Sequence, residues 1–139
     1  MDSIERSILI DAPVERVWTI VTEPEHLGTW FGDAGASRSG DIITMAWKEH
    51  GEAELRVVRE DAPRVFAFRW DANDAGVGDT LVEFTFTPEG SGTRLQVVES
   101  GFSRLNTSAQ RQQELRDGNT RGWAHELGDL ERYAQSVNV

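Results

Sequence analysis

The chain has 139 residues, no cysteine, and 24 acidic against 14 basic residues, which give a net charge of −10. This length suits one domain covering residues 1–139, and the lack of cysteine excludes a disulfide framework and a thiolate metal site. The negative charge disfavours nucleic acid and anionic membrane surfaces as partners. The first residues lack the features of a signal peptide and no run of about 18 apolar residues occurs, so we expect a soluble cytoplasmic protein.

The N-terminal part of the sequence predicts one strand followed by two short helices. Apolar residues alternate through Ile4–Ile10, as is typical of a strand. Asp11 is a candidate N-cap for the first helix, because a proline and an early acidic residue follow it. Thr22 and Glu25 form a possible capping box for the second helix, which we expect to end before Gly32.

The middle of the chain predicts a series of strands after a polar turn at residues 35–40. Short links rich in Gly, Pro and Asp separate the strands, and such links favour an antiparallel meander. Five strands are expected here, at residues 41–47, 52–60, 64–70, 80–87 and 93–100. Together with the N-terminal strand, the sequence predicts six strands.

One face of this sheet is predicted to be strongly apolar. Side chains alternate across a strand, and Phe66, Phe68 and Trp70 therefore share one side. The same parity is apolar in the next two strands, so the pattern holds across three consecutive strands. The matching positions there are Val82, Phe84, Phe86, Leu95 and Val97.

The C-terminal part predicts helices that cover this face. A helical segment at 106–116 is expected to break at Asp117 and Gly118 before a second helix. In that second helix apolar residues recur at i, i+4, i+7 and i+11, which makes one apolar stripe. The stripe needs an apolar partner, and the aromatic strand face is the largest available, so we expect a pocket between the two. The stripe residues are Trp123, Leu127, Leu130 and Ala134.

Several motifs in this order resemble the family of domains homologous to the C-terminal domain of the Hsp90 ATPase activator (AHSA1-like), in the START-like, SRPBCC superfamily. The resemblance covers nearly the whole chain. It rests on Ala12, Pro13, Val17 and Trp18; Pro24, Leu27, Trp30 and Phe31; Pro63, Arg64, Val65, Phe68 and Trp70; Thr93, Arg94 and Leu95; Glu99 to Phe102; and Gly122, Trp123, Leu127 and Leu130.

The resemblance implies an α+β helix-grip fold, in which a curved antiparallel sheet of six or seven strands wraps around a long C-terminal helix. Two short helices would follow the first strand. It also implies an internal cavity, which in the wider superfamily accepts lipids, sterols, polyketides or other hydrophobic molecules. Members include cyclases and hydroxylase components, so the fold alone does not decide the activity, and no catalytic residue is carried over.

Twelve residues are candidates for contact with a ligand. Each has two interpretations: it fills the core, as most aromatic stripes do, or it lines a cavity between the sheet and the helix. No cofactor is expected. The candidates are Leu55, Phe66, Phe68, Trp70, Val82, Phe84, Phe86, Leu95, Val97, Glu99, Trp123 and Leu127.

Glu99 is the one charged residue in this set. Its parity with Leu95 and Val97 points it to the apolar side, where a carboxylate is costly unless it is paired or protonated. It is therefore a candidate acid or base. The ordinary interpretation is that it lies at the rim in water, or pairs with Arg94 or Arg104.

The three histidines, His26, His50 and His125, lie in no metal-binding sequence pattern, and we expect all three at the surface and no metal site.

Three functions stay open: a domain that binds a small hydrophobic or amphipathic molecule, an enzyme of the cyclase or hydrolase kind that uses the same cavity, and a module that binds a chaperone or another protein through its acidic surface.

Overall fold

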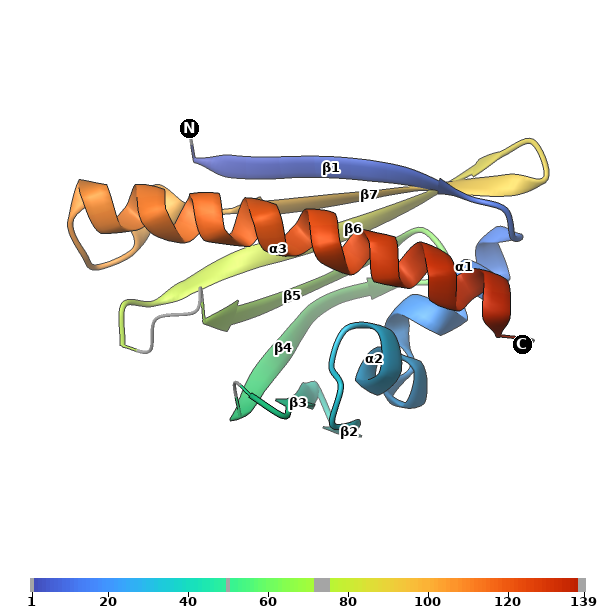
Figure 1. Cartoon of the computed structure of the whole chain (residues 1–139), viewed down its shortest axis with the longest axis horizontal. Coiled ribbons are helices and arrows are strands. Elements are labelled where there is room, and N and C mark those ends of the chain that lie inside the picture. Colours follow the sequence, from blue (N-terminus) through green and yellow to red (C-terminus); the bar gives the residue numbers. More distant parts are fainter. Residues whose placement is uncertain (1, 50, 72–75, 138–139) are drawn as a thin grey trace.

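The computed structural model describes residues 2–49, 51–71 and 76–137, and these form a curved antiparallel sheet that lies against a long helix (Figure 1). The strands are β1 (Ser3–Ile10), β2 (Ala36–Ser39), β3 (Ile42–Trp47), β4 (Gly51–Asp61), β5 (Val65–Asp71), β6 (Asp79–Glu89) and β7 (Gly92–Ser100). The helices are α1 (Val14–Thr22), α2 (Pro24–Trp30), the short 3-10 helix η1 (Phe102–Arg104) and α3 (Ala109–Ser136). The seven strands follow the order β1-β7-β6-β5-β4-β3-β2, which confirms the predicted helix-grip fold.

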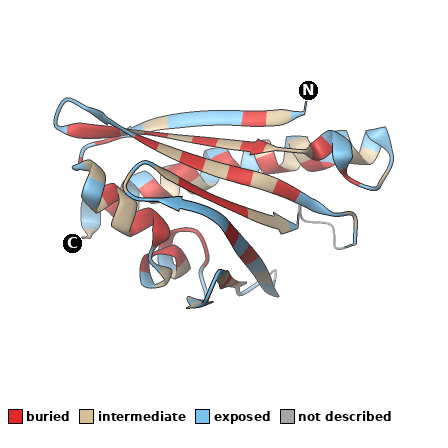
Figure 2. Ribbon diagram, turned by 180° about the vertical axis from the view of Figure 1, so that it is seen from behind, coloured by how far each residue is buried: buried red, intermediate tan, exposed pale blue. Residues whose placement is uncertain are grey.

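The strand register places the predicted apolar residues on one face of the sheet. Phe66 lies opposite Phe84 in the β5–β6 pair, and Phe84 lies opposite Val97 in the β6–β7 pair. Phe68 lies opposite Val82 in the same way. Figure 2 shows the resulting alternation of buried and more exposed residues along these strands. The period-two pattern in the sequence therefore correctly predicts the inner face.

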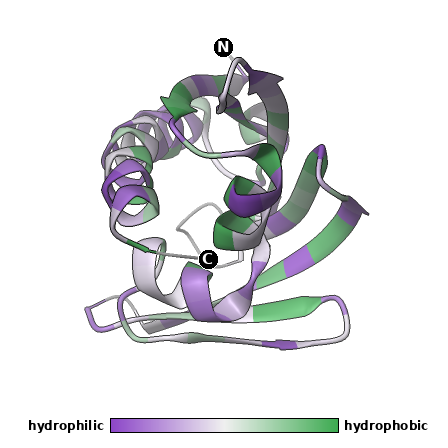
Figure 3. Cartoon of the chain, turned by 90° about the vertical axis from the view of Figure 1, so that its right-hand side faces the viewer, coloured by the Kyte–Doolittle hydropathy of each residue, from purple (hydrophilic) through white to green (hydrophobic). Residues whose placement is uncertain are grey.

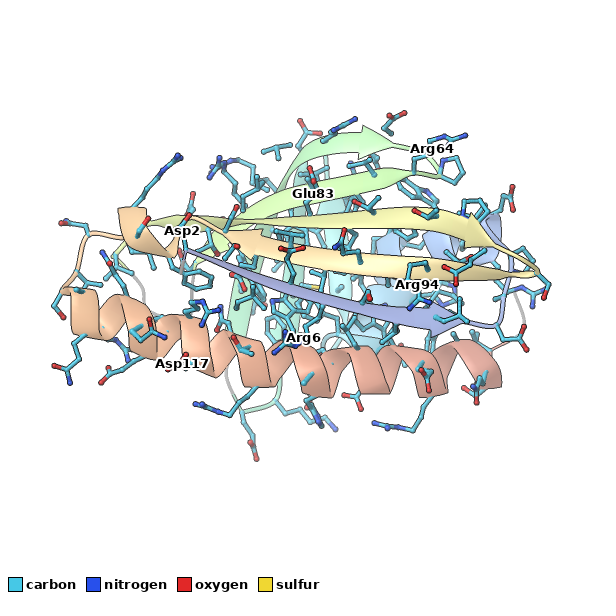
Figure 4. The ribbon with its side chains drawn as sticks, turned by 90° about the horizontal axis from the view of Figure 1, so that it is seen from above. Asp2, Arg6, Arg64, Glu83, Arg94 and Asp117 are labelled. Carbon is cyan, nitrogen blue, oxygen red and sulfur yellow. The ribbon has the colours of Figure 1, made fainter. Side chains whose placement is uncertain are left out.

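The sheet curves around the region that the core side chains fill, as the end-on view in Figure 3 shows. The register between β4 and β5 shifts between Val57 and Arg59, an irregularity of the kind that bends a strand and increases its twist. The outer face is charged: Arg6, Glu83 and Arg94, labelled in Figure 4, lie on β1, β6 and β7.

Helix α3 runs without interruption through Asp117 and Gly118, so the predicted break is wrong. A glycine within a helix is unfavourable by about 1 kcal/mol, but Leu115 and Trp123 are buried on either side of this point. The burial of Leu115 and Trp123 therefore outweighs the unfavourable helix propensity of Gly118. At the start of the helix, Ser108 accepts a hydrogen bond from the backbone N–H of Arg111 at 3.1 Å.

The predicted polar turn at residues 35–40 is also wrong, because its centre forms β2. Ala36 pairs with Met45 and Ser39 with Ile42, so β3 supplies hydrogen-bond partners for a segment whose own sequence looks like a loop. The flanking Gly35 and Gly40 have φ values of 97° and 61°, in the left-handed region that glycine adopts readily. These glycines bound the strand.

The two N-terminal helices form as predicted, but their predicted caps are wrong. The N-cap residue of α1 is Pro13 rather than Asp11. The N-cap residue of α2 is Glu23, and Thr22 instead donates its hydroxyl to the carbonyl oxygen of Trp18 at 2.8 Å. A threonine that resembles a helix cap can thus satisfy its hydroxyl group within the preceding helix instead.

In the described part of the chain, no helix combines the length and apolar character needed to cross a membrane.

Candidate functional site

A buried carboxylate lies between the sheet and α3. Glu99 of β7 has 0% exposure, and its side chain accepts hydrogen bonds from four neutral side chains. The indole N–H groups of Trp70 and Trp123 donate at 2.9 and 2.8 Å, and the hydroxyl of Thr80 donates at 2.5 Å. The amide of Asn119 reaches both carboxylate oxygens, at 3.1 and 3.2 Å. Burial of a carboxylate is costly without such partners, and here β5, β6 and α3 supply them.

The ordinary interpretation of Glu99, a residue in water at the rim or paired with an arginine, is therefore wrong. Arg94 forms its ion pair with Glu89, at 3.1 Å, and Arg104 is exposed. Parity in β7 correctly predicts the inward direction of Glu99. Its donors come from positions 19 to 29 residues away in the chain, on other elements, which no local pattern indicates.

Aromatic rings surround this carboxylate. Phe31, which follows α2, is stacked on Trp123 with ring centroids 5.5 Å apart and an interplanar angle of 8°. Trp70 lies 6.0 Å from Trp123, and Phe84 contacts Trp123 edge-on at 5.7 Å. Phe31 also contacts Trp47 edge-on at 5.6 Å. Phe31 thus connects the Glu99 hydrogen-bond network to the end of α2.

On the other side of Phe31 lies a pocket of about 400 Å³ between α2, β3 and the C-terminal half of α3. The ring systems that line it are Trp30, Phe31, Trp47 and Tyr133. The charged or titratable groups that line it are Asp33, His125, Glu126, Asp129 and Arg132.

The aromatic walls of this pocket are held in place by their own hydrogen bonds. Trp30 donates its indole N–H to the carbonyl of Ile20 at 2.9 Å, and Trp47 donates to the carbonyl of Phe31 at 2.9 Å. Both indole donors are therefore already used. Trp47 therefore presents partly exposed ring surface that is fixed before any ligand binds, whereas Trp30 is almost completely buried.

Glu126 is the unusual polar group of the pocket. Its Oε2 atom is buried and has no hydrogen-bond partner among the residues that the structure describes. Burial, followed by the negative charges of Asp129 and Asp33, raises the pKa of Glu126 from its ordinary 4.5 to about 8. The ionised form of this carboxyl is therefore disfavoured in the empty pocket.

The rim of the pocket carries paired charges. Asp129 forms an ion pair with Arg132, and the Nε2 atom of His125 lies 3.2 Å from the same carboxylate. His125, Glu126 and Asp129 each offer one possible metal-ligand atom, and these atoms lie within 4.8 Å of one another. The Arg132 guanidinium already neutralises Asp129, which makes the group less suited to a divalent cation.

The histidine predictions are partly correct. The side chain of His125 is 72% exposed, as predicted. His26 is buried, which contradicts the prediction, and its Nδ1 lies 2.6 Å from the hydroxyl of Tyr133. The imidazole of His26 thus has a hydrogen-bond partner within the protein and needs no contact with water. His50 lies outside the described residues.

The structure places the twelve predicted site residues together, on the inner face of the sheet and on α3. Eleven are buried and Trp70 is partly exposed. None of the twelve lines the 400 Å³ pocket, which begins one ring further out, beyond Phe31. Their contact with a ligand stays a prediction.

Sequence reasoning missed the pocket residues, although two signals were present. Trp47 has the parity of the buried Ile43 and Met45, so it points to the inner side of β3. Glu126 lies three residues after Trp123 and four before Leu130, which places it at the margin of the apolar stripe. Only the packing of α2 against both β3 and α3 brings these two residues to one pocket.

Comparison with solved structures shows the same fold elsewhere. Protein MLL2253 from Mesorhizobium loti is 20% identical, with a TM-score of 0.79 over 99% of each chain. DynU16, assigned to the dynemicin biosynthetic locus, is 26% identical with a TM-score of 0.73, over 97% of this chain and 48% of that one. CalU16 from Micromonospora echinospora is 24% identical with a TM-score of 0.71, over 96% of this chain and 65% of that one. The chain thus spans about half of the DynU16 chain and about two thirds of the CalU16 chain.

No curated protein sequence gives a significant match. The sequence profile of the family described as "Activator of Hsp90 ATPase homolog 1-like protein" matches residues 11–135, which is most of the chain. The inward aromatic face, the long C-terminal helix and the two short helices after β1 agree with that match. The chain therefore belongs to the family of activator of Hsp90 ATPase homolog 1-like proteins.

Proposed function

We propose that this chain is a domain that binds a small hydrophobic or amphipathic molecule in the pocket between α2, β3 and α3. The observation that carries the proposal is the pocket of about 400 Å³ with fixed aromatic walls. Small-molecule sites have volumes of about 300–1,000 Å³, mostly apolar linings and a few polar groups that orient the ligand. The pocket has this size, and its lining combines aromatic rings with a larger share of polar groups than such sites usually have.

Phe31 gives the pocket a route to the protein interior. Its ring lines the pocket and is stacked on Trp123, which in turn donates to Glu99. A ligand that displaces Phe31 would reach the aromatic residues predicted from the sequence. The pocket and the predicted inner site are then the outer and inner parts of one binding region.

The geometry favours binding over proton transfer by Glu99. A catalytic base must be within hydrogen-bond reach of the proton that it removes, and both Glu99 oxygens already accept hydrogen bonds from protein groups. Glu99 is better suited to hold Trp70 and Trp123 in place. The cyclase or hydrolase alternative would need another residue to carry the proton.

A titration followed by amide and indole NMR tests the proposal. The chain has five tryptophans, and a ligand in the pocket should shift the indole N–H signals of Trp30 and Trp47 in a saturable way. The panel contains lipids, flavonoids and aromatic acids and amines. Thr29, which lines the pocket, is changed to Trp to fill it, and the exposed Thr87 on β6 is changed to Trp as the matched control.

Loss of the shifts in the Thr29→Trp variant and their retention in Thr87→Trp would support the pocket. Equal shifts in both variants would show that the ligand binds elsewhere. If no member of the panel produces saturable shifts at Trp30 and Trp47, the proposed binding function fails.

A protein partner is the second candidate, because the family is named for activation of Hsp90 ATPase. Glu52 and Glu54 are exposed on β4 and present negative charge that a basic surface could contact. A complex with purified Hsp90 that weakens with added salt and with Glu52→Lys and Glu54→Lys would favour this function. The Thr29→Trp variant should bind Hsp90 unchanged.

A further inference from the structure

We propose that the pocket selects ligands that carry a positively charged amine, with the ammonium group held by Glu126 and the apolar body packed on the aromatic walls. This inference rests on the proposed binding function and names the chemical class of the ligand. It starts from the buried Glu126 Oε2 atom, which lacks a hydrogen-bond donor within the described residues. A buried acceptor without a partner costs about 1–3 kcal/mol, and a ligand donor would recover that loss.

The charges around the pocket favour a cation over an anion. The carboxylates of Asp33, Glu126 and Asp129 face it, against one guanidinium, that of Arg132. Arg132 is already paired with Asp129, and its side chain is 70% exposed, so it offers little to an anionic ligand inside the pocket. An ammonium near Glu126 would offset the repulsion that Asp33 and Asp129 exert on its ionised form.

The walls suit the same ligand. Because the indole donors of Trp30 and Trp47 are used in bonds to the backbone, these residues offer ring faces and edges rather than N–H groups. Aromatic rings attract organic cations as well as apolar groups. The hydroxyl of Tyr133 is likewise engaged with His26, at 2.6 Å. Among the lining residues, Glu126 then has a buried carboxyl oxygen with an open position.

The ionisation of Glu126 gives the site a measurable property. Burial first, and then Asp129 and Asp33, raise the pKa of Glu126 to about 8, so the free pocket holds a proton on this carboxyl at pH 7. The other titratable or charged groups that line the pocket are His125, Arg132 and Tyr133. An ammonium ligand favours the ionised carboxylate, so its binding should release a proton, and its affinity should rise as the pH increases from 6 to about 8.

Three probes with one carbon skeleton test the inference: 4-phenylbutylammonium, 4-phenylbutan-1-ol and 5-phenylvalerate. Binding is measured by NMR at the Trp30 and Trp47 indoles and by calorimetry in two buffers of different ionisation enthalpy. EDTA is present throughout, so that no metal ion occupies the groups around Asp129. We expect the ammonium probe to bind at least tenfold more tightly than the alcohol, the carboxylate to bind most weakly, and proton release to accompany the ammonium probe alone.

Matched variants assign the preference to one residue. Glu126→Gln should remove the tenfold preference and the proton release while it leaves binding of the alcohol intact. Glu131→Gln makes the same change in charge on an exposed residue of α3 and should alter neither. Amide spectra establish that both variants fold.

The outcomes separate this inference from the proposed function. Equal binding of the ammonium and alcohol probes at the Trp30 and Trp47 indoles would overturn the amine preference and leave the pocket as a binding site. An ammonium preference that survives in Glu126→Gln would also overturn the assignment. Absence of binding by all three probes at millimolar concentration would overturn both the preference and the pocket.

Discussion

The indole N–H of Trp123 donates to Glu99 Oε1 at 2.8 Å, and this bond joins the middle of α3 to the inner face of β7. Both residues are almost completely buried, so the bond is formed away from water, where an unpaired donor or acceptor is most costly. The same Trp123 ring is stacked on Phe31. Trp123 therefore holds the sheet, the helix and the wall of the pocket in one arrangement.

Replacement of Glu99 by glutamine should destabilise the protein by about 1–3 kcal/mol, because one indole loses its acceptor whichever way the amide is turned. Trp123 donates to one carboxylate oxygen and Trp70 to the other, and an amide has only one oxygen. Urea unfolding measures the change. The control, Glu131→Gln, alters an exposed carboxylate of α3 and should leave the midpoint unchanged. An unaltered midpoint for Glu99→Gln would contradict the role assigned to the network.

Alanine substitutions at two helical glycines should have opposite signs. A Cβ at Gly28 would lie 2.6 Å from the backbone of both Gly35 and Ala36, so Gly28→Ala should destabilise the protein by about 1–3 kcal/mol. A Cβ at Gly122 in α3 meets no atom within 4 Å, so Gly122→Ala should stabilise it by about 0.5–1 kcal/mol. Thermal and urea unfolding give both values. Stabilisation by Gly28→Ala would show that α2 lies further from β2 than described.

The stability of the protein should fall between about pH 4.5 and about pH 8 through Glu126. Its pKa rises on folding from 4.5 to about 8, because of burial and the nearby Asp129 and Asp33. In that window the native state holds a proton that the unfolded state has lost, so stability decreases as the pH increases. The contribution is fully present below pH 4.5 and is lost above pH 8.

Urea unfolding at several pH values compares the wild-type chain with Glu126→Gln, which cannot ionise. The variant should show a smaller decline across this window, and the exposed control Glu131→Gln should follow the wild type. Parallel curves for Glu126→Gln and the wild type would mean that this carboxyl titrates normally.

The contact between His26 and Tyr133 should couple α2 to α3. Tyr133→Phe removes the hydroxyl that lies 2.6 Å from Nδ1 of the buried His26, and we expect a loss of about 1 kcal/mol. In a double-mutant cycle with His26→Leu, the combined loss should be smaller than the sum of the two single losses. Additive effects would indicate that the hydrogen bond contributes nothing to stability.

The sequence by itself determined the inner face of the sheet and the apolar stripe of the long helix. Both are local periodic patterns: residues two apart in a strand, such as Phe84 and Phe86, share a face, and residues four apart in a helix, such as Trp123 and Leu127, share a side. Burial of these faces provides the main driving force for folding, so the patterns predicted an antiparallel sheet with a helix packed on it, and the family resemblance implied the helix-grip fold. Parity alone also pointed Glu99 inward.

The tertiary structure decided what local patterns do not contain. Segment 36–39 is a strand because β3 pairs with it, and α3 is continuous because the sheet buries residues on both sides of Gly118. The partners of Glu99 lie on two other strands and on α3. Glu126 of α3 and Trp47 of β3 line one pocket because α2 packs against both elements. Whether a buried polar group finds a hydrogen-bond partner, and whether a pocket is enclosed, depend on elements far apart in the chain. Local periodic patterns therefore predict the sheet face and the helix stripe, and the site depends on tertiary packing.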